Sequence, residues 1–524
     1  MPLPARLAVA AVCGLGAGVS FEPLRLVFLL PVAVALLTLS CRGGSMPRGF
    51  LTGTVFGMAF MLTLLPWLQV IGVDAWVGLS LLEALFYGLL GLGTAAVTRL
   101  PFWPVWVAAL WVAVEAARGT IPFGGFPWGR LAFATIDTPV APLFAYVGSA
   151  GVTFAVALVS TVLAWAIVMV RRTPVRASAA VAATCLFASL GSGFAHPLAP
   201  GPNDDARTVV VAAVQGNVPG EGMDAFAERR AVLNNHVEAT EEYAAQVAAG
   251  DARQADLVIW PENSTDIDPF SDPTVFDDIQ GAVDEVGVPT LVGALTEGPD
   301  GGVRNVGIAW DPVTGPGETY AKSHLVPFGE YIPFRDLLRP YFGRLEMVGS
   351  DKVPGTEPGL LDMNGVRVGD VICFEVAYDD LLRDVVRGGA GVVTVQTNNA
   401  TYISTGQVEQ QFAISRLRAI ETGRHVVVAA TNGISGIIAP TGEVLQRTVP
   451  RTQEVLVGDI TLETEVGPGI RWGALVEQLL ALVAALAVCV GVGVGYRRRR
   501  RRRRQRRDTG GGPRQRADTS IGEA

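Results

Sequence analysis

Long apolar runs alternate with short polar segments along the first 195 residues, and one more apolar run precedes a C-terminal arginine block. A helix needs about 20 apolar residues to cross the hydrocarbon core of a bilayer. The first run also has the features of a signal peptide, because Arg6 precedes a short apolar stretch, so cleavage stays open as an alternative. The pattern predicts eight membrane spans, at 5–21, 24–41, 49–71, 76–98, 102–118, 139–170, 177–195 and 473–496.

The stretch from 205 to 465 follows another pattern, in which short β-branched runs alternate with segments of helical periodicity. Such alternation is typical of an α/β domain whose helices cover a sheet. The predicted strands are 208–214, 256–260, 289–295, 305–310, 366–372, 391–396, 425–431 and 454–460. The predicted helices are 224–249, 274–286, 376–387 and 406–422.

Composition supports this division. Hydrophobic residues make up 50% of the chain and charged residues 17%, whereas soluble proteins carry about 25% charge. We therefore expect a membrane domain at 1–195 with an outer-face loop at 119–138, an α/β domain at 205–465, a final membrane helix at 473–496 and a basic, disordered tail at 497–524.

Charge predicts the orientation. Arg42, Arg48, Arg99 and the arginines at 171–176 fall on the same side of the predicted bilayer as the arginine block at 497–507. Because basic loops stay in the cytoplasm, the 205–465 domain is expected on the extracytoplasmic face of the cell membrane and the C-terminus in the cytoplasm. The block is interpreted as a stop-transfer anchor.

The block contributes +10 to a formal net charge of −8, so the rest of the chain carries −18. This acidic balance, and the lack of aromatic residues among the arginines, argue against nucleic acid as a partner. The α/β region contains no Gly-rich phosphate loop and no metal-ligand spacing, so neither a metal nor a cofactor is expected.

Three short strings place reactive side chains where a predicted strand ends. Glu262 lies in Ile-Trp-Pro-Glu-Asn-Ser (259–264), and Lys322 lies in Tyr-Ala-Lys-Ser-His (320–324), which runs into a segment containing Glu330 and Tyr331. Cys373 follows the strand Gly-Asp-Val-Ile and is the only cysteine of the α/β domain. The carboxyl ends of strands are where α/β proteins carry their sites.

Together these residues supply a nucleophile, a carboxylate base and a cation to stabilise a developing oxyanion. These are the catalytic groups that acyl transfer requires. A turn from strand to helix at Cys373 would expose the sulfur and favour its thiolate. Each residue alone also has an ordinary interpretation. A cysteine on a β-rich segment is more often a small buried hydrophobe, and a single Glu or Lys at a strand end is usually solvated surface.

The three strings, in this order, resemble the Glu-Lys-Cys triad of the nitrilase superfamily in its membrane-bound branch, the apolipoprotein N-acyltransferases. The string Tyr-Ala-Lys-Ser-His-Leu-Val-Pro-Phe-Gly-Glu-Tyr-Ile-Pro (320–333) is similar to the family's. So are Trp111 to Gly119, Pro-Phe-Gly-Gly-Phe-Pro-Trp (122–128), Val-Gln-Gly-Asn (214–217) and Arg416 to Arg424. The resemblance covers roughly residues 1–496.

The resemblance implies an αββα sandwich and a ping-pong reaction. Glu262 would deprotonate Cys373, which would take an acyl chain from a membrane phospholipid, while Lys322 held the oxyanion. The thioester would then pass the chain to the N-terminal amino group of a diacylglyceryl lipoprotein. Glu330 and Glu375 would be auxiliary acid/base groups, although Glu375 is equally well explained as a structural partner of Lys322.

Aromatic residues indicate where acyl chains would enter. Phe123, Phe126 and Trp128 of the outer loop, with Tyr331 and other aromatic residues of 323–345, would form an apolar portal. Interfacial anchoring is the simpler alternative. Two departures from the family concern the substrate groove: Phe374 stands where many relatives carry Tyr or Trp, and the string around Asn398 is altered. We nevertheless expect both residues to contact substrate.

Glu83, Glu115 and Arg118 are charged residues that lie within the predicted spans. Glu83 and Glu115 are functional candidates because carboxylates are costly within a bilayer, but Glu115 is also placed to pair with Arg118 three residues later.

Two other functions remain open from the sequence. A membrane-tethered amidase or nitrilase would use the same triad but hydrolyse the thioester. A catalytically inert membrane scaffold or transporter is the second, although the presence of all three triad residues argues against it.

Overall fold

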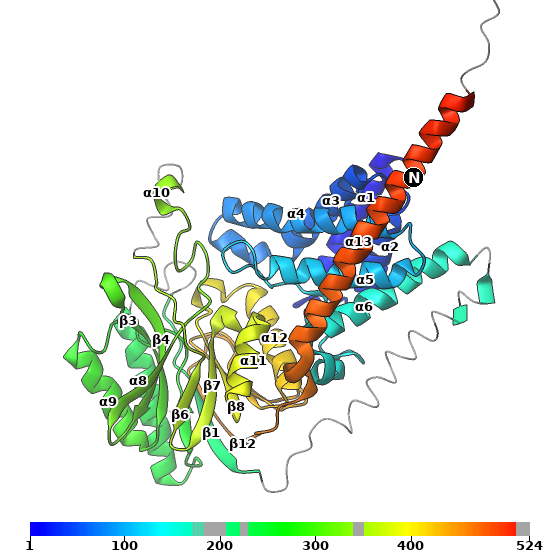
Figure 1. Ribbon diagram of the computed structural model, residues 1–524. Helices are drawn as coiled ribbons and strands as arrows, with labels where there is room; N and C mark the ends of the chain where they lie inside the picture. The colour runs from blue at the N-terminus through cyan, green and yellow to red at the C-terminus, as the bar shows by residue number, and fades with distance from the viewer. Residues whose placement is uncertain are drawn as a thin grey trace, which may run out of the picture.

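The computed structural model describes residues 1–170, 206–220, 229–338 and 350–509, together with 173–175, 178–179 and 182. It consists of a helical bundle and an α/β sandwich packed side by side (Figure 1). Several expectations lie outside the described residues: the span at 177–195, the start of the helix at 224, part of the aromatic segment at 323–345, and the tail beyond 509.

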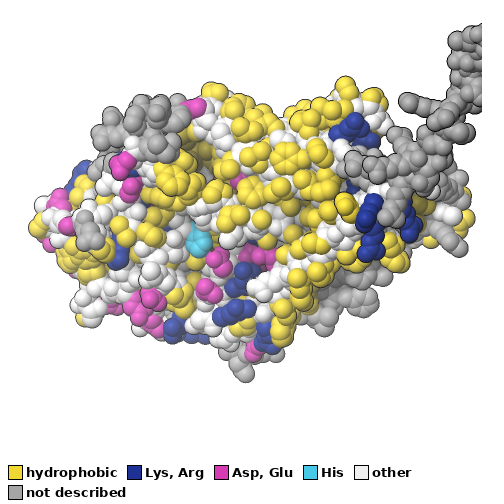
Figure 2. Space-filling view, turned by 45° about the horizontal axis from the view of Figure 1, so that its top comes forward, with side chains coloured by type: hydrophobic (Ala, Val, Ile, Leu, Met, Phe, Trp, Pro, Cys, Tyr) yellow, Lys and Arg dark blue, Asp and Glu magenta, His cyan; other side chains and the backbone are white. Residues whose placement is uncertain are grey.

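The predicted spans of the bundle fold as helices. They are α1 (Leu3–Gly18), α2 (Leu29–Cys41), α3 (Met46–Leu64), α4 (Val73–Val97), α5 (Trp103–Arg118), α6 (Phe144–Met169) and α13 (Pro468–Thr509). Within the described residues, three helical stretches are long and apolar enough to cross a membrane, namely Val73–Val97, Ala141–Met169 and Pro468–Arg498. Hydrophobic side chains form a broad band over this part of the molecule (Figure 2).

Small residues allow the helices of the bundle to approach closely. A Cβ atom at Gly53 of α3 would lie 2.0 Å from the carbonyl oxygen of Tyr87 in α4, and one at Gly49 would lie 2.4 Å from that of Gly91. Backbone contact of this kind is how membrane helices pack where lipid offers no hydrophobic driving force. The α3–α4 pair is therefore fixed by glycine positions.

The sandwich contains two six-stranded sheets. The first has the order β12-β1-β2-β3-β4-β5 and the second β11-β10-β9-β8-β7-β6. The strands of the first sheet are β1 (Thr208–Gln215), β2 (Leu257–Ile259), β3 (Thr290–Glu297), β4 (Val303–Asp311), β5 (Gly315–Ala321) and β12 (Glu454–Thr461). Those of the second are β6 (Leu360–Met363), β7 (Val366–Ile372), β8 (Val392–Thr397), β9 (Val426–Ala430), β10 (Gly436–Ile438) and β11 (Val444–Arg447).

Helices cover both outer faces of the paired sheets. The first sheet packs against α8 (Arg229–Ala249) and α9 (Pro273–Val286) through residues such as Trp260 and Ile279. The second is covered by α11 (Asp379–Arg387) and α12 (Gln407–Thr422). The predicted αββα architecture is confirmed.

The layer formed by α11 and α12 also contacts the bundle. Buried residues of both helices, including Leu382 and Leu417, belong to one hydrophobic cluster with residues of the bundle such as Trp111 and Phe133. Figure 1 shows α11 and α12 between the second sheet and helices α5, α6 and α13. The sandwich and the bundle therefore share a core.

All eight predicted strands are present, but β5, β6, β10 and β11 were not predicted. These four strands are short, or, like β5, rich in glycine and polar residues, so they lack the β-branched runs on which the prediction depended. The helix predicted at 376–387 also begins differently. A 3-10 turn, η7 (Cys373–Ala377), comes first, and the extended residue Tyr378 separates it from α11.

Candidate active site

Cys373 occupies a strained position directly after β7. Its φ angle is +57°, in the left-handed region that non-glycine residues rarely adopt. Such strain persists where the surrounding structure enforces it, and it is concentrated at active sites. The side chain is partly exposed, and the Thr397 hydroxyl donates to its Sγ over 3.4 Å. The predicted turn after the strand is confirmed, in a tighter form than an α-helix.

Glu375 fixes this turn from within. Its buried carboxylate accepts hydrogen bonds from the backbone N–H groups of Ile372, Ser323 and His324, at 2.8, 2.8 and 2.9 Å. The Tyr320 hydroxyl donates to it as well, over 2.9 Å. Glu375 therefore ties the Cys373 turn to the loop that follows Lys322, and it forms no ion pair with Lys322 among the described residues.

Glu262 and Lys322 form a buried ion pair, with 3.0 Å between Oε1 and Nζ. Glu262 follows β2 and Lys322 follows β5, so both lie at strand ends as the sequence indicated. Asn305 of β4 donates to Glu262 Oε1 over 2.7 Å, and the backbone N–H of Asn398 donates to Oε2 over 2.8 Å. The carboxylate is thereby held by three donors on different elements.

Glu330 is the second carboxylate of this group. It lies 3.2 Å from Lys322 Nζ and 3.0 Å from Lys352 Nζ. Burial alone would raise the pKa of Glu330, but the two ammonium groups outweigh burial and hold the pKa at about 2. Glu330 is therefore ionised at any physiological pH and neutralises the cation that Glu262 also contacts.

The electrostatics of the group favour a charged lysine and a protonated thiol, so the expectation that the turn would favour the Cys373 thiolate is wrong. Burial raises the pKa of the Cys373 thiol to about 12, and the nearby Glu262 carboxylate adds to this effect. Burial opposes the charge on Lys322, but Glu262 and Glu330 together raise the pKa of its ammonium group well above the ordinary value. A thiol with so high a pKa would need a base to remove its proton before the sulfur could act as a nucleophile.

The aromatic residues are brought together only in part. Phe374 stacks on Phe126 and on Trp128, with ring centroids 5.5 and 5.6 Å apart. Phe123 contacts Phe334 at 5.8 Å and accepts a hydrogen bond on its carbonyl from the Tyr331 hydroxyl over 3.4 Å. Phe123 and Phe334 remain 40% and 68% exposed, whereas Trp128 is only 2% exposed. Trp128 is thus a packed ring beside Phe374, the residue after Cys373.

Asn398 lies beside Glu262 at the end of β8. Its side-chain oxygen accepts hydrogen bonds from the backbone N–H of Ala400 and from the Thr431 hydroxyl, at 3.1 and 3.2 Å. Its backbone orients the proposed base, so the side chain shapes the loop around the site.

The charged residues of the spans hold the loop between α5 and α6 in place. Arg118 donates to Glu83 over 3.1 Å and to the carbonyl oxygen of Phe126 over 2.8 Å. Glu115 instead accepts from the N–H of Leu131 and from Thr153, at 2.8 and 2.7 Å. The ion pair expected between Glu115 and Arg118 is not observed. Arg118 pairs instead with Glu83 of the neighbouring helix α4.

Sequence reasoning missed three contributors to this site. Asn305 lies within a strand and carries no motif. Lys352 is one of only two lysines in the chain, the other being Lys322. Gln410 of α12 has no signal in the pattern, although its side chain contacts both Trp67 and Trp128. Within the described residues no group of three His, Cys, Asp or Glu side chains is arranged to hold a metal ion.

Comparison with known proteins agrees with both halves of the molecule. Residues 13–162 match the Apolipoprotein N-acyltransferase N-terminal domain, and residues 210–466 match the Carbon-nitrogen hydrolase domain. The apolipoprotein N-acyltransferase of Mycolicibacterium smegmatis is 39% identical over 92% of this chain and 84% of its own length. That of Photobacterium profundum is 26% identical over 87% and 89%.

Among solved structures, Nit3 of Saccharomyces cerevisiae, a nitrilase-superfamily member, aligns with 50% of this chain and 94% of its own, at 16% identity and a TM-score of 0.38. The relationship to the Mycolicibacterium smegmatis protein extends over 92% of this chain, so it includes parts of both the bundle and the sandwich. The chain therefore belongs to the apolipoprotein N-acyltransferase family.

Proposed function

We propose that the protein transfers a fatty acyl chain from a membrane phospholipid to the N-terminal amino group of a diacylglyceryl lipoprotein, with Cys373 as the nucleophile. The observation that carries this proposal is the buried Glu262–Lys322 pair, 3.0 Å apart, beside a cysteine held in a left-handed turn. A base, a cation and a strained thiol in one site are the requirements of covalent acyl transfer.

In the first half-reaction Glu262 takes the proton of the Cys373 thiol as the sulfur attacks the ester carbonyl carbon. The Lys322 ammonium group and backbone N–H groups stabilise the negative charge on the carbonyl oxygen. The tetrahedral intermediate collapses when the ester C–O bond breaks, and Glu262 returns its proton to the departing lysophospholipid alkoxide. The acyl chain is then a thioester on Cys373.

In the second half-reaction the free amine of the lipoprotein attacks the thioester carbonyl. Glu262 accepts a proton from the attacking nitrogen, the C–S bond breaks, and the proton passes to the sulfur. An amide forms and the thiol is restored. Glu330 and Lys352 keep the charge balance around Lys322 through both steps, and Glu375 maintains the turn that carries the sulfur.

The helical bundle favours lipid substrates over small amides. Phe374, next to the nucleophile, stacks on Phe126 and Trp128 of the loop between α5 and α6. The exposed rings of Phe123 and Phe334 extend this apolar surface outward. The charge distribution supports an orientation with the sandwich outside the cytoplasm and the arginine block inside it.

The proposal is tested with a phospholipid that carries a labelled acyl chain. The wild-type enzyme is expected to acquire a hydroxylamine-sensitive label, and the Cys373→Ser variant to acquire none. Cys489→Ser is the matched control, because Cys489 is an exposed thiol of α13 and its loss should leave labelling unchanged. A hydroxylamine-sensitive label on Cys373→Ser would refute the proposed nucleophile.

The acceptor is tested by adding a diacylated lipopeptide to the labelled enzyme. The label is expected to move to the N-terminus of the peptide. Release of free fatty acid at the same rate with and without the peptide would favour the amidase or nitrilase alternative, in which water is the acceptor.

A further inference from the structure

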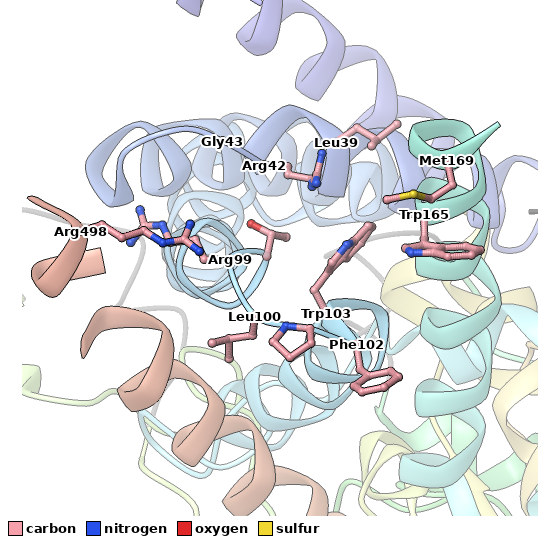
Figure 3. A pocket seen from close by; sticks show the side chains of 12 residues that line it. Leu39, Arg42, Gly43, Arg99, Leu100, Phe102, Trp103, Trp165, Met169 and Arg498 are labelled. Carbon is pink, nitrogen blue, oxygen red and sulfur yellow. The ribbon is translucent and has the colours of Figure 1, made fainter. Parts of the chain in front are cut away.

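A cavity of about 630 Å³ opens at the end of the bundle that lies away from the sandwich. It lies among the C-terminal ends of α2, α4 and α6, the N-terminal end of α5 and the far part of α13. Its lining includes three arginines, Arg42, Arg99 and Arg498, and no acidic residue. Figure 3 shows the three arginines around the cavity together with Trp103 and Trp165.

The cavity is remote from the proposed catalytic group. The sandwich contacts the opposite ends of the same helices, for example where Ser149 of α6 accepts a hydrogen bond from Arg418 over 3.0 Å. Along α13, Gly469 lies against Phe144 near the sandwich, whereas Arg498 lines the cavity. A helical rise of 1.5 Å per residue separates these two positions by about 43 Å, which exceeds the thickness of the hydrocarbon core.

The side chain of Arg42 has a hydrogen-bond donor that is not used within the described part of the protein. Its guanidinium lies over the Trp103 ring, 5.6 Å from the centroid. Its buried Nε has no hydrogen-bond partner, and no described acidic residue forms an ion pair with it. A buried donor without a partner is costly, so an acceptor supplied by a ligand would stabilise this arrangement.

The other two arginines are placed by the packing of α13. A Cβ atom at Gly495 would come within 2.2 Å of Arg99 Nη1, so the glycine gives the Arg99 guanidinium room beside the helix. Arg99 also donates to the carbonyl oxygen of Gly44 over 3.5 Å. Arg498 follows Gly495 by three residues and is exposed. Basic side chains gather at this end of the bundle in the space-filling view (Figure 2).

We propose that this cavity binds the phosphate headgroup of an anionic phospholipid in the leaflet opposite the sandwich. Guanidinium groups match phosphate oxygens in charge and geometry, and basic pockets between membrane helices bind anionic headgroups. The tryptophans are suited to the interface between headgroups and acyl chains. A free phosphate ion would carry the same charge as a lipid headgroup, but it would make no use of the tryptophans that line the cavity. The site is additional to the acyl-donor site proposed at Cys373.

The experiment uses the purified full-length enzyme and a lipid that cannot donate an acyl chain. Ether-linked phosphatidylglycerol is titrated into the detergent-solubilised protein, and bound lipid is counted by native mass spectrometry, with ether-linked phosphatidylcholine as the neutral comparison. The variants are Arg42→Gln and, as the matched control, Arg48→Gln, because Arg48 is exposed on the same end of the bundle but does not line the cavity.

We expect one phosphatidylglycerol to bind in preference to phosphatidylcholine, with its affinity reduced about tenfold in Arg42→Gln and unchanged in Arg48→Gln. Equal losses in both variants would mean that the arginines act only as general topological anchors, and would overturn the proposal. Displacement of the lipid by millimolar inorganic phosphate would assign the cavity to a free anion and would overturn it too. Elution volume on size exclusion checks that Arg42→Gln is folded.

Discussion

The conformation of Cys373 requires support from residues that do not react. A left-handed φ costs about 1–3 kcal/mol for a non-glycine residue, and the bonds of Glu375 to Ile372, Ser323 and His324 hold the turn against that cost. Thr397 accepts from Gln411 Nε2 over 3.0 Å, which leaves its proton for Cys373 Sγ. The sulfur is thus held in one orientation by the surrounding hydrogen bonds.

Glu262→Gln should reduce acyl transfer by about 10²–10⁴-fold, the usual contribution of a general base. The amide retains the shape and the hydrogen bond from Asn305 but cannot take the thiol proton. Thioester formation measured in a single turnover checks this. Glu297→Gln, an exposed carboxylate at the end of β3, should leave the rate unchanged. A Glu262→Gln enzyme with wild-type thioester formation would exclude Glu262 as the base.

Asp370 should give the protein a pH-dependent stability. It is buried between the sheets, its Oδ2 has no partner, and burial raises its pKa to about 8, against about 3.9 in an unfolded chain. Between these values the folded state retains a proton that the unfolded state has released, so stability falls as pH rises and levels off above about pH 8.

Asp370→Asn removes this titration. The apparent melting temperature of the wild type should therefore fall more between pH 5 and pH 8 than that of the variant. Asp277→Asn, an exposed carboxylate of α9, should keep the wild-type slope. Parallel curves for the wild type and Asp370→Asn would contradict the prediction.

At the scale of elements, α12 connects the surroundings of Cys373 with the helical bundle. Gln411 faces Thr397, while its neighbour Gln410 faces the bundle and is 7% exposed. Gln410 Oε1 accepts from the indole N–H groups of Trp67 and Trp128, at 3.2 and 2.8 Å. Its Nε2 donates to the carbonyl oxygens of Glu22 and Leu64, both over 3.0 Å. One side-chain amide thus forms hydrogen bonds with three segments of the bundle.

Gln410→Ala should destabilise the protein by about 1–3 kcal/mol, because it leaves buried N–H and C=O groups unpaired. It should also raise KM for the phospholipid more than it lowers kcat, since Trp128 would lose the bond that orients it against Phe374. Thermal unfolding and steady-state kinetics measure the two effects. Gln246→Ala, on the exposed face of α8, is the control. An unchanged KM in Gln410→Ala would contradict the prediction that Gln410 positions Trp128.

The elements that can be predicted well from sequence are those determined by the residues of the element itself. The β-branched runs of β1, β8 and β9 are buried on both faces and so remain continuous. Glu262, Lys322 and Cys373 could be proposed as site residues because each lies at or shortly after the end of a strand. Asn305, Lys352 and Gln410 could not, because their roles depend on partners that only the fold brings near. A buried glutamine on a helix of mixed polarity has the same pattern as a surface one.

At the scale of the molecule, a buried ionic group joins the sandwich to the bundle. Arg130 of the outer loop lies 2.6 Å from Asp379 at the start of α11, and Arg418 of α12 lies 2.8 Å from the same carboxylate. Glu477 of α13 is 3.6 Å from Arg130. Burial opposes ionisation of Asp379, but the arginines outweigh burial and hold its pKa well below the ordinary range.

Arg130→Gln should therefore lower the stability by about 3–5 kcal/mol, the usual effect of removing one partner of a buried ion pair. The double variant with Asp379→Asn should lose less than the sum of the two single changes, because each single change already removes the interaction between Arg130 and Asp379. Thermal unfolding of the four proteins gives this coupling. Arg230→Gln, whose ion pair with Asp278 is exposed, is the control, and additive losses would show that the pair is not coupled.

The shared layer of α11 and α12 also limits how the enzyme can be divided. A fragment limited to residues 205–465 would leave Leu382, Phe412 and Leu417, now buried in the common core, without the bundle that covers them. Exposed apolar surface of this extent leads to aggregation. A water-soluble catalytic fragment would therefore need polar replacements over that face, and Phe374 would still lack the two rings on which it rests.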